Sequence, residues 1–256
     1  MIWQVQQHDP DCVVIVDQFA RTGADNMDLD QRALELTCRE AAADAQSPTI
    51  CRIYRWDQPT VTVGYFQDLS VPVPDEISGC PRVKRLTGGG AILHDLEFTY
   101  SVVVPARHSI RSEPLRLYDV VHTAIINTLA IQEIRCCMRQ DSPLFRDGSL
   151  EKTTETTPEP FLCFLRQDDR DIVIGKDKIV GSAQRRRKGS ILQHGSILLR
   201  ASKLIPDVVG LHDLEPSFDS EAFLNQIAEA IGKSISNHFE ILKLDDGEQK
   251  LHQLLT

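Results

Sequence analysis

The sequence lacks any apolar run approaching the roughly 20 residues that a membrane-spanning helix requires. Its first residues, MIWQVQQHDPD, lack the basic region and the apolar core of a secretory signal. A basic surplus is also missing, because 37 acidic residues outnumber 28 lysines and arginines and give a net charge of −9. Proteins that bind nucleic acid broadly usually carry a basic footprint. We therefore expect neither a membrane protein nor a nucleic-acid-binding protein.

Cysteine pairs with the spacing of a redox or metal site are missing as well. The seven cysteines are odd in number and include no C-x-x-C motif, which fits a reduced cytoplasm better than a disulfide framework. No cluster of His, Cys and Asp has the spacing of metal ligands. We expect a cytoplasmic protein without a metal site.

Length and composition are those of an ordinary folded protein, with 256 residues, 41% hydrophobic and 25% charged. The pattern of apolar residues in the first half of the chain predicts a largely helical stretch over 11–46, interrupted near Gly23, with Asn26 as the cap of its second helix. It then predicts a two-strand hairpin over 50–66 that turns at Asp57–Pro59. A connector with a weak helix over 68–81, strands within 82–105 and a helix over 112–133 follow. The second half predicts a mobile, Thr/Glu/Pro-rich loop over 139–160, turn-linked strands over 163–199, an amphipathic helix over 218–239 and a short helix within 240–256.

Three consecutive glycines, Gly88, Gly89 and Gly90, follow a basic strand end at Lys84 and Arg85. Successive glycines allow positive φ angles and let a ligand lie directly against backbone N–H groups. The two cations add positive charge for a carboxylate, a thioester oxygen or a phosphate. No Gly-Lys-Ser follows and no helix opens after the glycines, so neither phosphate-binding fingerprint is present. The pattern indicates a ligand-binding turn, with a purely structural hairpin turn as the alternative.

The stretch from Cys163 to Leu199 carries the densest set of candidate residues. A lone thiol at Cys163 follows a Pro-containing connector, and Lys178 precedes a Gly-Ser-Ala-Gln turn. A free thiol with a pKa of about 8.5 is mostly protonated at neutral pH, and a nearby ammonium group stabilises the thiolate. The pair therefore predicts a nucleophilic cysteine assisted by Lys178, with a buried structural thiol as the alternative. The basic run Arg185–Lys188 predicts either a solvated turn or a docking patch for an acidic protein partner.

Four segments, taken in order, resemble the lipoate/octanoate protein transferase and ligase family, which is related in fold to the biotin protein ligases. They are RWDQPTVTVGYFQ (55–67), RLTGGGAILHDLEFTYS (85–101), the Cys163-Phe164 pair and KIVGSAQRRRKGSILQHGSILL (178–199), and NMDLD (26–30) accompanies them. The resemblance implies one α+β domain over residues 1–256. Its mixed, largely antiparallel sheet would be flanked by helices, as in the biotin protein ligase and lipoate ligase catalytic domains.

Within this family the sequence is most similar to the cysteine-dependent octanoyltransferases of the Gram-positive type, in which a cysteine that holds the acyl group as a thioester precedes a Lys-Ile/Val-x-Gly-Ser-Ala-Gln motif. The resemblance implies transfer of an octanoyl or lipoyl group, without a cofactor, from octanoyl-acyl carrier protein to a lysine of a lipoyl domain or a glycine cleavage H-type protein. It implies Cys163 and Lys178 as catalytic residues. The substrate-binding residues that it implies are Arg85, Thr87, Gly88, Gly89, Gly90, His94, Gly181, Ser182, Ala183, Gln184 and His194.

Other activities stay open at this point. The main alternative is an ATP-dependent lipoate-protein ligase, which uses ATP and Mg²⁺ to make an acyl-adenylate and needs no thiol. Gly90 resembles the ligase version of the glycine turn, since transferase relatives tend to carry an arginine there, and His94 with its neighbours is compatible with ligases. An amidotransferase between two lipoyl-type proteins and a non-catalytic acyl-binding protein are further alternatives. His94 and His194 could also be satisfied core histidines.

Overall fold

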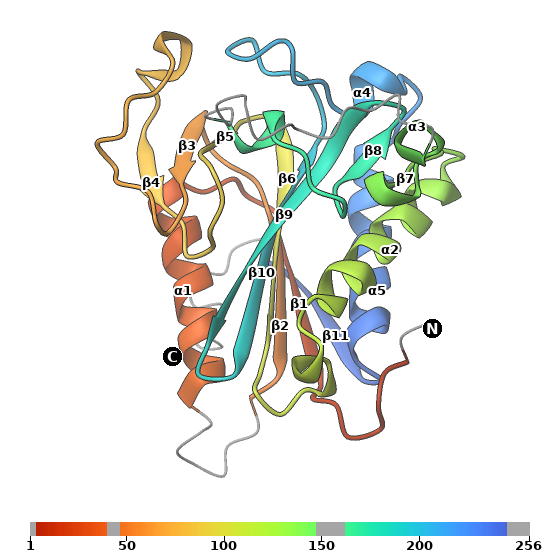
Figure 1. Cartoon of the computed structure of the whole chain (residues 1–256). Coiled ribbons are helices and arrows are strands. Elements are labelled where there is room, and N and C mark those ends of the chain that lie inside the picture. The colour runs from red at the N-terminus through yellow and green to blue at the C-terminus, as the bar shows by residue number, and fades with distance from the viewer. Residues whose placement is uncertain (1–3, 40–46, 147–161, 245–256) are drawn as a thin grey trace.

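The computed structural model describes residues 4–39, 47–146 and 162–244, and its largest feature is a mixed sheet (Figure 1). In these residues eight strands join in the order β11-β1-β2-β6-β10-β9-β8-β7. Their bounds are β1 Cys12–Asp17, β2 Thr49–Tyr54, β6 Glu97–Val104, β7 Cys137–Met138, β8 Ile172–Ile174, β9 Asp177–Arg187, β10 Ser190–Leu198 and β11 Phe239–Leu244. Strand β1 runs parallel to β2 and β11, and the other pairs are antiparallel. The expected mixed, largely antiparallel sheet is confirmed.

A smaller sheet carries the chain into and out of the glycine turn. Among the described residues it has three strands in the order β4-β3-β5, with β3 at Thr60–Val63, β4 at Arg82–Lys84 and β5 at Ile92–His94. Strand β3 is parallel to β4 and antiparallel to β5. The three glycines lie in the connection from β4 to β5, so this sheet fixes both ends of the turn.

Helices cover both faces of the large sheet (Figure 1). Helix α1 (Gly23–Arg39) packs on one face, and α2 (Arg116–Ile131) and α5 (Ser220–Ile235) pack together on the other. The side chains of β1 divide accordingly, since Val14 and Val16 join the core under α2 and α5, whereas Val13 and Ile15 join the core under α1. This alternation is what a strand buried on both faces requires. The α+β class with flanking helices is confirmed.

The shorter elements complete the described part of the chain. They are the helices α3 (Pro143–Arg146) and α4 (Leu211–Leu214) and 3₁₀ turns at Asp75–Ile77, Ser109–Ser112, Arg139–Asp141 and Cys163–Leu165. The predicted helices over 112–133 and 218–239, the strands within 82–105 and the strands over 163–199 are confirmed. The weak helix expected in the 68–81 connector is the first of these 3₁₀ turns. No helix in the described segments is long and apolar enough to cross a bilayer.

The expected helix over residues 11–22 is wrong, because Cys12–Asp17 form strand β1. The run CVVIV is apolar at every position, so its sequence shows no strand alternation. Both faces of this strand are covered by helices, which explains why no polar residue interrupts it, and its β-branched residues favour a strand.

Asn26 does not cap α1 as predicted, because the helix already begins at Gly23. The Thr22 hydroxyl accepts a hydrogen bond from the Asp25 N–H at 3.2 Å, which satisfies a free donor of the first turn. Asn26 lies inside the helix, where its side-chain amide donates to the Arg55 carbonyl at 3.1 Å. Its role is to fasten α1 to the end of β2.

Strands β2 and β3 exist where the sequence predicts them, but the expected hairpin between them is wrong. Strand β2 is flanked by β1 on one edge and by β6 on the other, so it has no free edge for β3. The turn at 57–59 instead carries the chain from the large sheet to the small one. A pairing decided by neighbours distant in sequence could not be deduced from the local pattern.

The expected C-terminal helix is wrong for Phe239–Leu244, which form β11 and pair with β1 along its whole length. Residues 245–256 lie outside the described residues. The same holds for 147–161, which make up most of the loop expected over 139–160. The first part of that loop folds into the 3₁₀ turn at Arg139–Asp141 and helix α3.

Candidate active site

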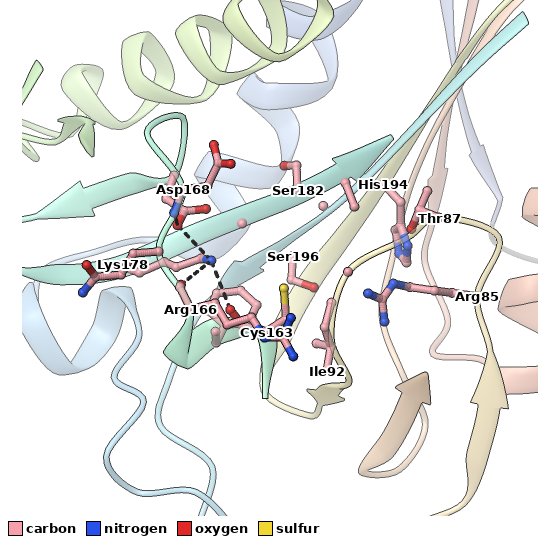
Figure 2. Close-up of a pocket in the computed structure, with 17 residues that line it drawn as sticks. Arg85, Thr87, Ile92, Cys163, Arg166, Asp168, Lys178, Ser182, His194 and Ser196 are labelled. Carbon is pink, nitrogen blue, oxygen red and sulfur yellow. Dashed lines mark hydrogen bonds and ion pairs between the residues drawn. The ribbon is translucent and has the colours of Figure 1, made fainter. Parts of the chain in front are cut away.

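The glycine turn, the Cys163 segment and the paired middle parts of β9 and β10 line a cavity of about 250 Å³ (Figure 2). Nine of the residues predicted from the sequence line it: Arg85, Thr87, Gly89, Cys163, Lys178, Gly181, Ser182, Ala183 and His194. In Figure 2, Lys178 and Cys163 approach the cavity from one side and Arg85 and His194 from the other. Side chains up to about 110 residues apart in sequence therefore meet at one place.

Cys163 begins a 3₁₀ turn that is anchored on the residue after the glycine turn. Its N–H donates to the Ala91 carbonyl at 2.7 Å, and Leu162 forms a β-bridge with the same residue. The partly exposed thiol reaches the cavity beside Gly89, since a Cβ added to that glycine would lie 3.6 Å from Cys163 Sγ. The backbone pairing explains how a cysteine far along the chain comes to lie against the glycine turn.

Arg85 is buried and holds the glycine turn in shape. Its Nη2 donates to the carbonyls of Gly88 (2.5 Å) and Gly90 (2.7 Å), and its Nη1 donates to Thr62. Gly88 and Gly90 therefore stabilise the turn through carbonyls that accept hydrogen bonds from Arg85, and neither glycine lines the cavity. Gly89 does line it, and its φ of +91° lies in the left-handed region that favours glycine.

The Arg85 guanidinium is also an electrostatic partner of the sulfur. A Cβ added to Gly89 would lie 2.9 Å from Arg85 Nη2, so the guanidinium and Cys163 Sγ flank the same glycine. Burial lowers the pKa of Arg85 to about 10, the charge of an ionised Cys163 opposes that fall, and the nearby Arg166 adds to it. Arg85 remains a cation at neutral pH.

Lys178 lies near the start of β9, and the Gly-Ser-Ala-Gln residues continue this strand instead of forming the expected turn. The ammonium Nζ pairs with the Asp171 carboxylate at 2.9 Å and donates to the carbonyls of Cys163 (3.4 Å) and Arg166 (3.2 Å). Burial raises the pKa of Asp171, and the Lys178 charge opposes that rise. The lysine therefore lies beside the main chain of Cys163, held by a carboxylate that the sequence did not single out.

Two glycines make room for the polar side chains of the cavity. A Cβ on Gly181 would lie 2.6 Å from Lys178 Cε, and a Cβ on Gly195 would lie 2.5 Å from Ser182 Oγ. Strands β9 and β10 place Gly181 opposite Ser196 and Ser182 opposite Gly195, so two Gly-Ser dipeptides face one another in crossed register. These glycines are needed for space and not for an unusual backbone angle.

Ser182 connects the cavity to a buried hydrogen-bond network. Its hydroxyl lies 2.6 Å from the Tyr100 hydroxyl and 2.8 Å from His122 Nε2. Behind it, the Gln193 amide donates to the Tyr100 hydroxyl at 3.0 Å, and the Gln184 amide donates to the Gln193 carbonyl at 2.9 Å. Gln184 thus supports the site from outside the cavity.

The two predicted histidines lie in different environments. His94 does not line the cavity, because its ring is held between Glu97 (Nδ1 to Oε1, 2.8 Å) and Thr62 (Nε2 to Oγ1, 2.9 Å). His194 does line the cavity, and its Nε2 lies 3.1 Å from the Tyr54 hydroxyl. Burial holds the pKa of His194 well below its usual range, so its ring is neutral at pH 7.

Several residues of the site escape sequence reasoning. Asp171 and His122 lie outside the motif segments, and Tyr100 lies within the 85–101 segment but was not singled out as a site residue. They reach the site through strand pairing and helix packing. Arg166 was also not predicted. Its guanidinium lies beside the glycine turn, since a Cβ on Gly90 would lie 2.8 Å from Arg166 Cζ. The space above Gly90 is thus filled by a guanidinium from another segment.

The basic run at the end of β9 is exposed at its tip. The Arg185 guanidinium stacks 3.7 Å from the centre of the Tyr65 ring, and Lys84 Nζ lies 5.6 Å from the same ring. Arg185 also donates to the Leu86 carbonyl at 3.0 Å, which joins this surface to the glycine turn. Its expected role as a docking patch stays a prediction. In the described residues no group of three or more His, Cys, Asp or Glu side chains is arranged to hold a metal ion.

Comparison with known proteins places these features in a family. Residues 22–214 match the lipoyl protein ligase A/B catalytic domain. The chain is 35% identical over 182 residues to the octanoyltransferase LipM of Macrococcus caseolyticus, covering 68% of this chain and 60% of that protein. It is 37% identical to the Moorella thermoacetica LipM (68% and 60% covered) and 30% identical to the Staphylococcus epidermidis LipM (83% and 72% covered). The matches thus span 60% of the length of the first and second of these relatives.

Solved structures share the fold. A lipoate-protein ligase A bound with ATP superposes with a TM-score of 0.64 at 20% identity, covering 96% of this chain and 94% of that one. A bipartite lipoate protein ligase from Thermoplasma acidophilum gives 0.57 at 18% identity, covering 97% and 92%. The resemblance inferred from the four motif segments is confirmed by the family match, and the chain belongs to the lipoyl protein ligase A/B catalytic domain family.

Proposed function

We propose that this protein is an octanoyltransferase that holds an octanoyl or lipoyl group as a thioester on Cys163. The observation that carries the proposal is the position of one thiol. Of seven cysteines, all of them in described segments, Cys163 alone lines the cavity, where it lies beside the glycine turn and the Arg85 guanidinium. The named octanoyltransferase relatives support the same reaction.

In the first step, the Cys163 thiolate attacks the carbonyl carbon of an octanoyl thioester on an acyl carrier protein. A new C–S bond forms at Cys163, the old C–S bond breaks, and its electron pair leaves with the carrier sulfur, which takes up the proton that Cys163 lost. The Arg85 guanidinium, which flanks the same glycine as the sulfur, supplies a positive charge beside the reacting carbonyl. Lys178, which reaches the main chain of Cys163, adds a second positive charge for the developing oxyanion.

In the second step, a lysine amine of a lipoyl domain or a glycine cleavage H-type protein attacks acyl-Cys163. A C–N bond forms, the C–S bond to Cys163 breaks, and the proton lost by the amine restores the thiol. Conversion of a thioester to an amide is downhill, so the reaction needs neither ATP nor another cofactor. The cytoplasm is the proposed location, supported by seven free thiols that suit a reducing compartment.

Intact-protein mass spectrometry tests this function. The full-length chain is mixed with octanoyl-acyl carrier protein without ATP, as wild type, Cys163→Ala and the control Cys80→Ala, whose thiol lies away from the cavity. We expect an octanoyl adduct on wild type and on the control and none on Cys163→Ala. Absence of the adduct on wild type, together with formation of acyl-adenylate from free acid and ATP in all three proteins, would refute the transferase and identify an ATP-dependent ligase.

A further inference from the structure

A buried chain of polar side chains runs from the cavity into the face of the large sheet that α1 covers. His194, which lines the cavity, lies at one end, with its Nε2 3.1 Å from the Tyr54 hydroxyl. Tyr54 donates to Asp30 Oδ2 at 2.9 Å, and Asp30 Oδ1 pairs with Arg52 Nη1 at 2.7 Å. All four side chains are buried. The directions of these hydrogen bonds decide what the open side of the His194 ring can bind.

Strand pairing places His194 on the face of the sheet that carries the cavity. His194 and Ser196 are two residues apart in β10, so they share a face. Ser196 lies opposite Gly181 in the β9–β10 register, and directly opposite residues also share a face. Gly181 is the residue at which an added Cβ would meet Lys178. His194 therefore lies on the Lys178 side of the sheet, and Figure 2 shows it across the cavity from Cys163.

The Tyr54 hydroxyl fixes the tautomer of His194. Burial and the charge of Asp30 hold the pKa of Tyr54 well above its usual range, so the hydroxyl keeps its one hydrogen at pH 7. The Asp30 carboxylate is paired with Arg52 and can only accept, so this hydrogen points to Asp30. The Tyr54 oxygen therefore accepts from His194, whose hydrogen lies on Nε2. A neutral imidazole has one such hydrogen, so Nδ1 carries the lone pair.

The Nδ1 lone pair is open to the cavity. Within the described residues no group makes a hydrogen bond to this atom, and it does not belong to the unpartnered polar atoms that are fully buried. His194 is 5% exposed, and it lines the cavity. The wall across from Cys163 thus presents a hydrogen-bond acceptor of fixed direction that no side chain of the described segments occupies.

We propose that His194 Nδ1 receives one N–H of the lysine amine that attacks acyl-Cys163, and that Tyr54, held by Asp30, is the positioning residue that keeps this acceptor turned to the cavity. The inference rests on the proposed function and names the group that orients its second step. An acyl thioester has no N–H or O–H to offer, whereas a primary amine has two N–H groups. The proton balance of the step is unchanged, since the amine loses one proton and the Cys163 sulfur gains one.

The charges around the ring favour a neutral amine at this position. Burial is the main cause of the low pKa of His194, and the positive charges of Arg85 and Arg52 add to it. The same charges disfavour the ammonium form of an incoming lysine, because like charges repel. The neutral amine has the lone pair that the attack requires, and its N–H groups are available to Nδ1.

The test separates the two half-reactions of the full-length chain. Acyl-Cys163 is formed with octanoyl-acyl carrier protein and is then offered a lipoyl domain, butylamine or 2-mercaptoethanesulfonate, which attacks as a thiolate and has neither N–H nor O–H. In Tyr54→Phe the His194 hydrogen is free to lie on either nitrogen. We expect loading and thiol release within about threefold of wild type. Transfer to the lipoyl lysine and to butylamine should be slower by about five- to tenfold, the usual range for one lost hydrogen bond.

Two substitutions of His194 test the acceptor itself. His194→Leu removes it, and we expect amine transfer to slow by about tenfold while thiol release changes little. His194→Asn places an amide oxygen close to the position of Nδ1 and should recover part of the amine transfer. This pair carries the test if thermal unfolding shows that Tyr54→Phe loses the fold.

Tyr118→Phe is the matched control. It removes a tyrosine hydroxyl from α2 that lies outside the cavity lining, and it should leave all steps unchanged.

Four outcomes would overturn the inference or its basis. Amine transfer at the wild-type rate would refute the acceptor if seen in His194→Leu, and the positioning role if seen in Tyr54→Phe. Equal slowing of loading or thiol release would refute the acceptor, because His194 would then act on the acyl group or its carrier. Slow transfer to the lipoyl domain with unchanged transfer to butylamine would also refute it and indicate a docking effect. Absence of acyl-Cys163 in wild type would refute the proposed function itself, which is a distinguishable failure.

Discussion

The sharpest test of the site's geometry is Gly181→Ala, which adds one methyl group beside Lys178. The new Cβ would lie 2.6 Å from Lys178 Cε, whereas nonbonded carbons prefer about 3.5–4.0 Å. The lysine tip must therefore move by about 1 Å. That movement disturbs its 2.9 Å contact with Asp171. The backbone at Gly181 has no positive φ, so the substitution introduces no conformational strain of its own.

A displacement of about 1 Å in a positioning group can cost about 100-fold in rate. We therefore expect Gly181→Ala to lower octanoyl transfer to a lipoyl domain by about 100-fold. The stability cost of such overpacking is about 1–3 kcal/mol, which leaves a domain of ordinary stability folded at 25 °C. Transfer is measured by mass spectrometry of the lipoyl domain, and folding by urea denaturation of the same preparation.

Gly79→Ala is the matched control, because a Cβ there meets no atom within 4 Å and the backbone is unstrained. It should retain wild-type transfer and stability. The reasoning is refuted if Gly181→Ala transfers within about threefold of wild type while folded. Loss of transfer that merely follows loss of the folded state would equally remove the support for a precisely placed ammonium.

Three further predictions concern stability. The pKa of His122 is about 4 in the folded protein against 6.5 unfolded, so its contribution is complete above pH 6.5 and is lost as the pH falls to about 4. Between pH 7 and about pH 4, the free energy of unfolding measured in urea should fall by about 3 kcal/mol more in wild type than in His122→Gln. An equal pH dependence of the two proteins would contradict this prediction. Gly195→Ala drives a Cβ to 2.5 Å from the Tyr100 ring and should destabilise by about 3 kcal/mol in thermal unfolding. Asp171→Asn removes the partner of the Lys178 ammonium, whose side chain is 12% exposed, and should cost about 3 kcal/mol in urea, whereas an unchanged midpoint would mean that the pair contributes nothing.

Much of the fold could be predicted because its signals are local. The amphipathic spacing in Arg116–Ile131 and Ser220–Ile235 specifies two helices whatever surrounds them. Strand Cys12–Asp17 lacks the alternation of apolar and polar residues that marks a half-exposed strand, since helices cover both of its faces and Cys12 to Val16 are all apolar. The partner of Thr60–Val63 is set by which sheet edges remain free, and that depends on the whole chain.

The candidate site divides in the same way. Cys163 and Lys178 belong to motif segments and could be found by resemblance alone. Their environment could not, because Tyr100 and His122 reach Ser182 from 82 and 60 residues away in sequence. The sequence reasoning also assigned the cation beside the thiol to Lys178. The fold adds Arg85 on the other side of the sulfur, across Gly89.

The crossed Gly-Ser dipeptides of β9 and β10 have a consequence for how this site can evolve. Gly181 faces Ser196 and Ser182 faces Gly195. A side chain gained at Gly195 collides with Ser182 of β9 and with Tyr100 of β6, whereas one gained at Gly181 collides with Lys178 of its own strand. Substitutions at Gly195 should therefore covary with those at Ser182 and Tyr100 across descendants of this chain, because both of these side chains occupy the space that a new Cβ would need. A chimera whose crossover falls in the turn at residues 188–189 would take β9 from one parent and β10 from the other. It would lose this packing unless both parents carry the same Gly-Ser dipeptides. The hairpin is inherited as one unit.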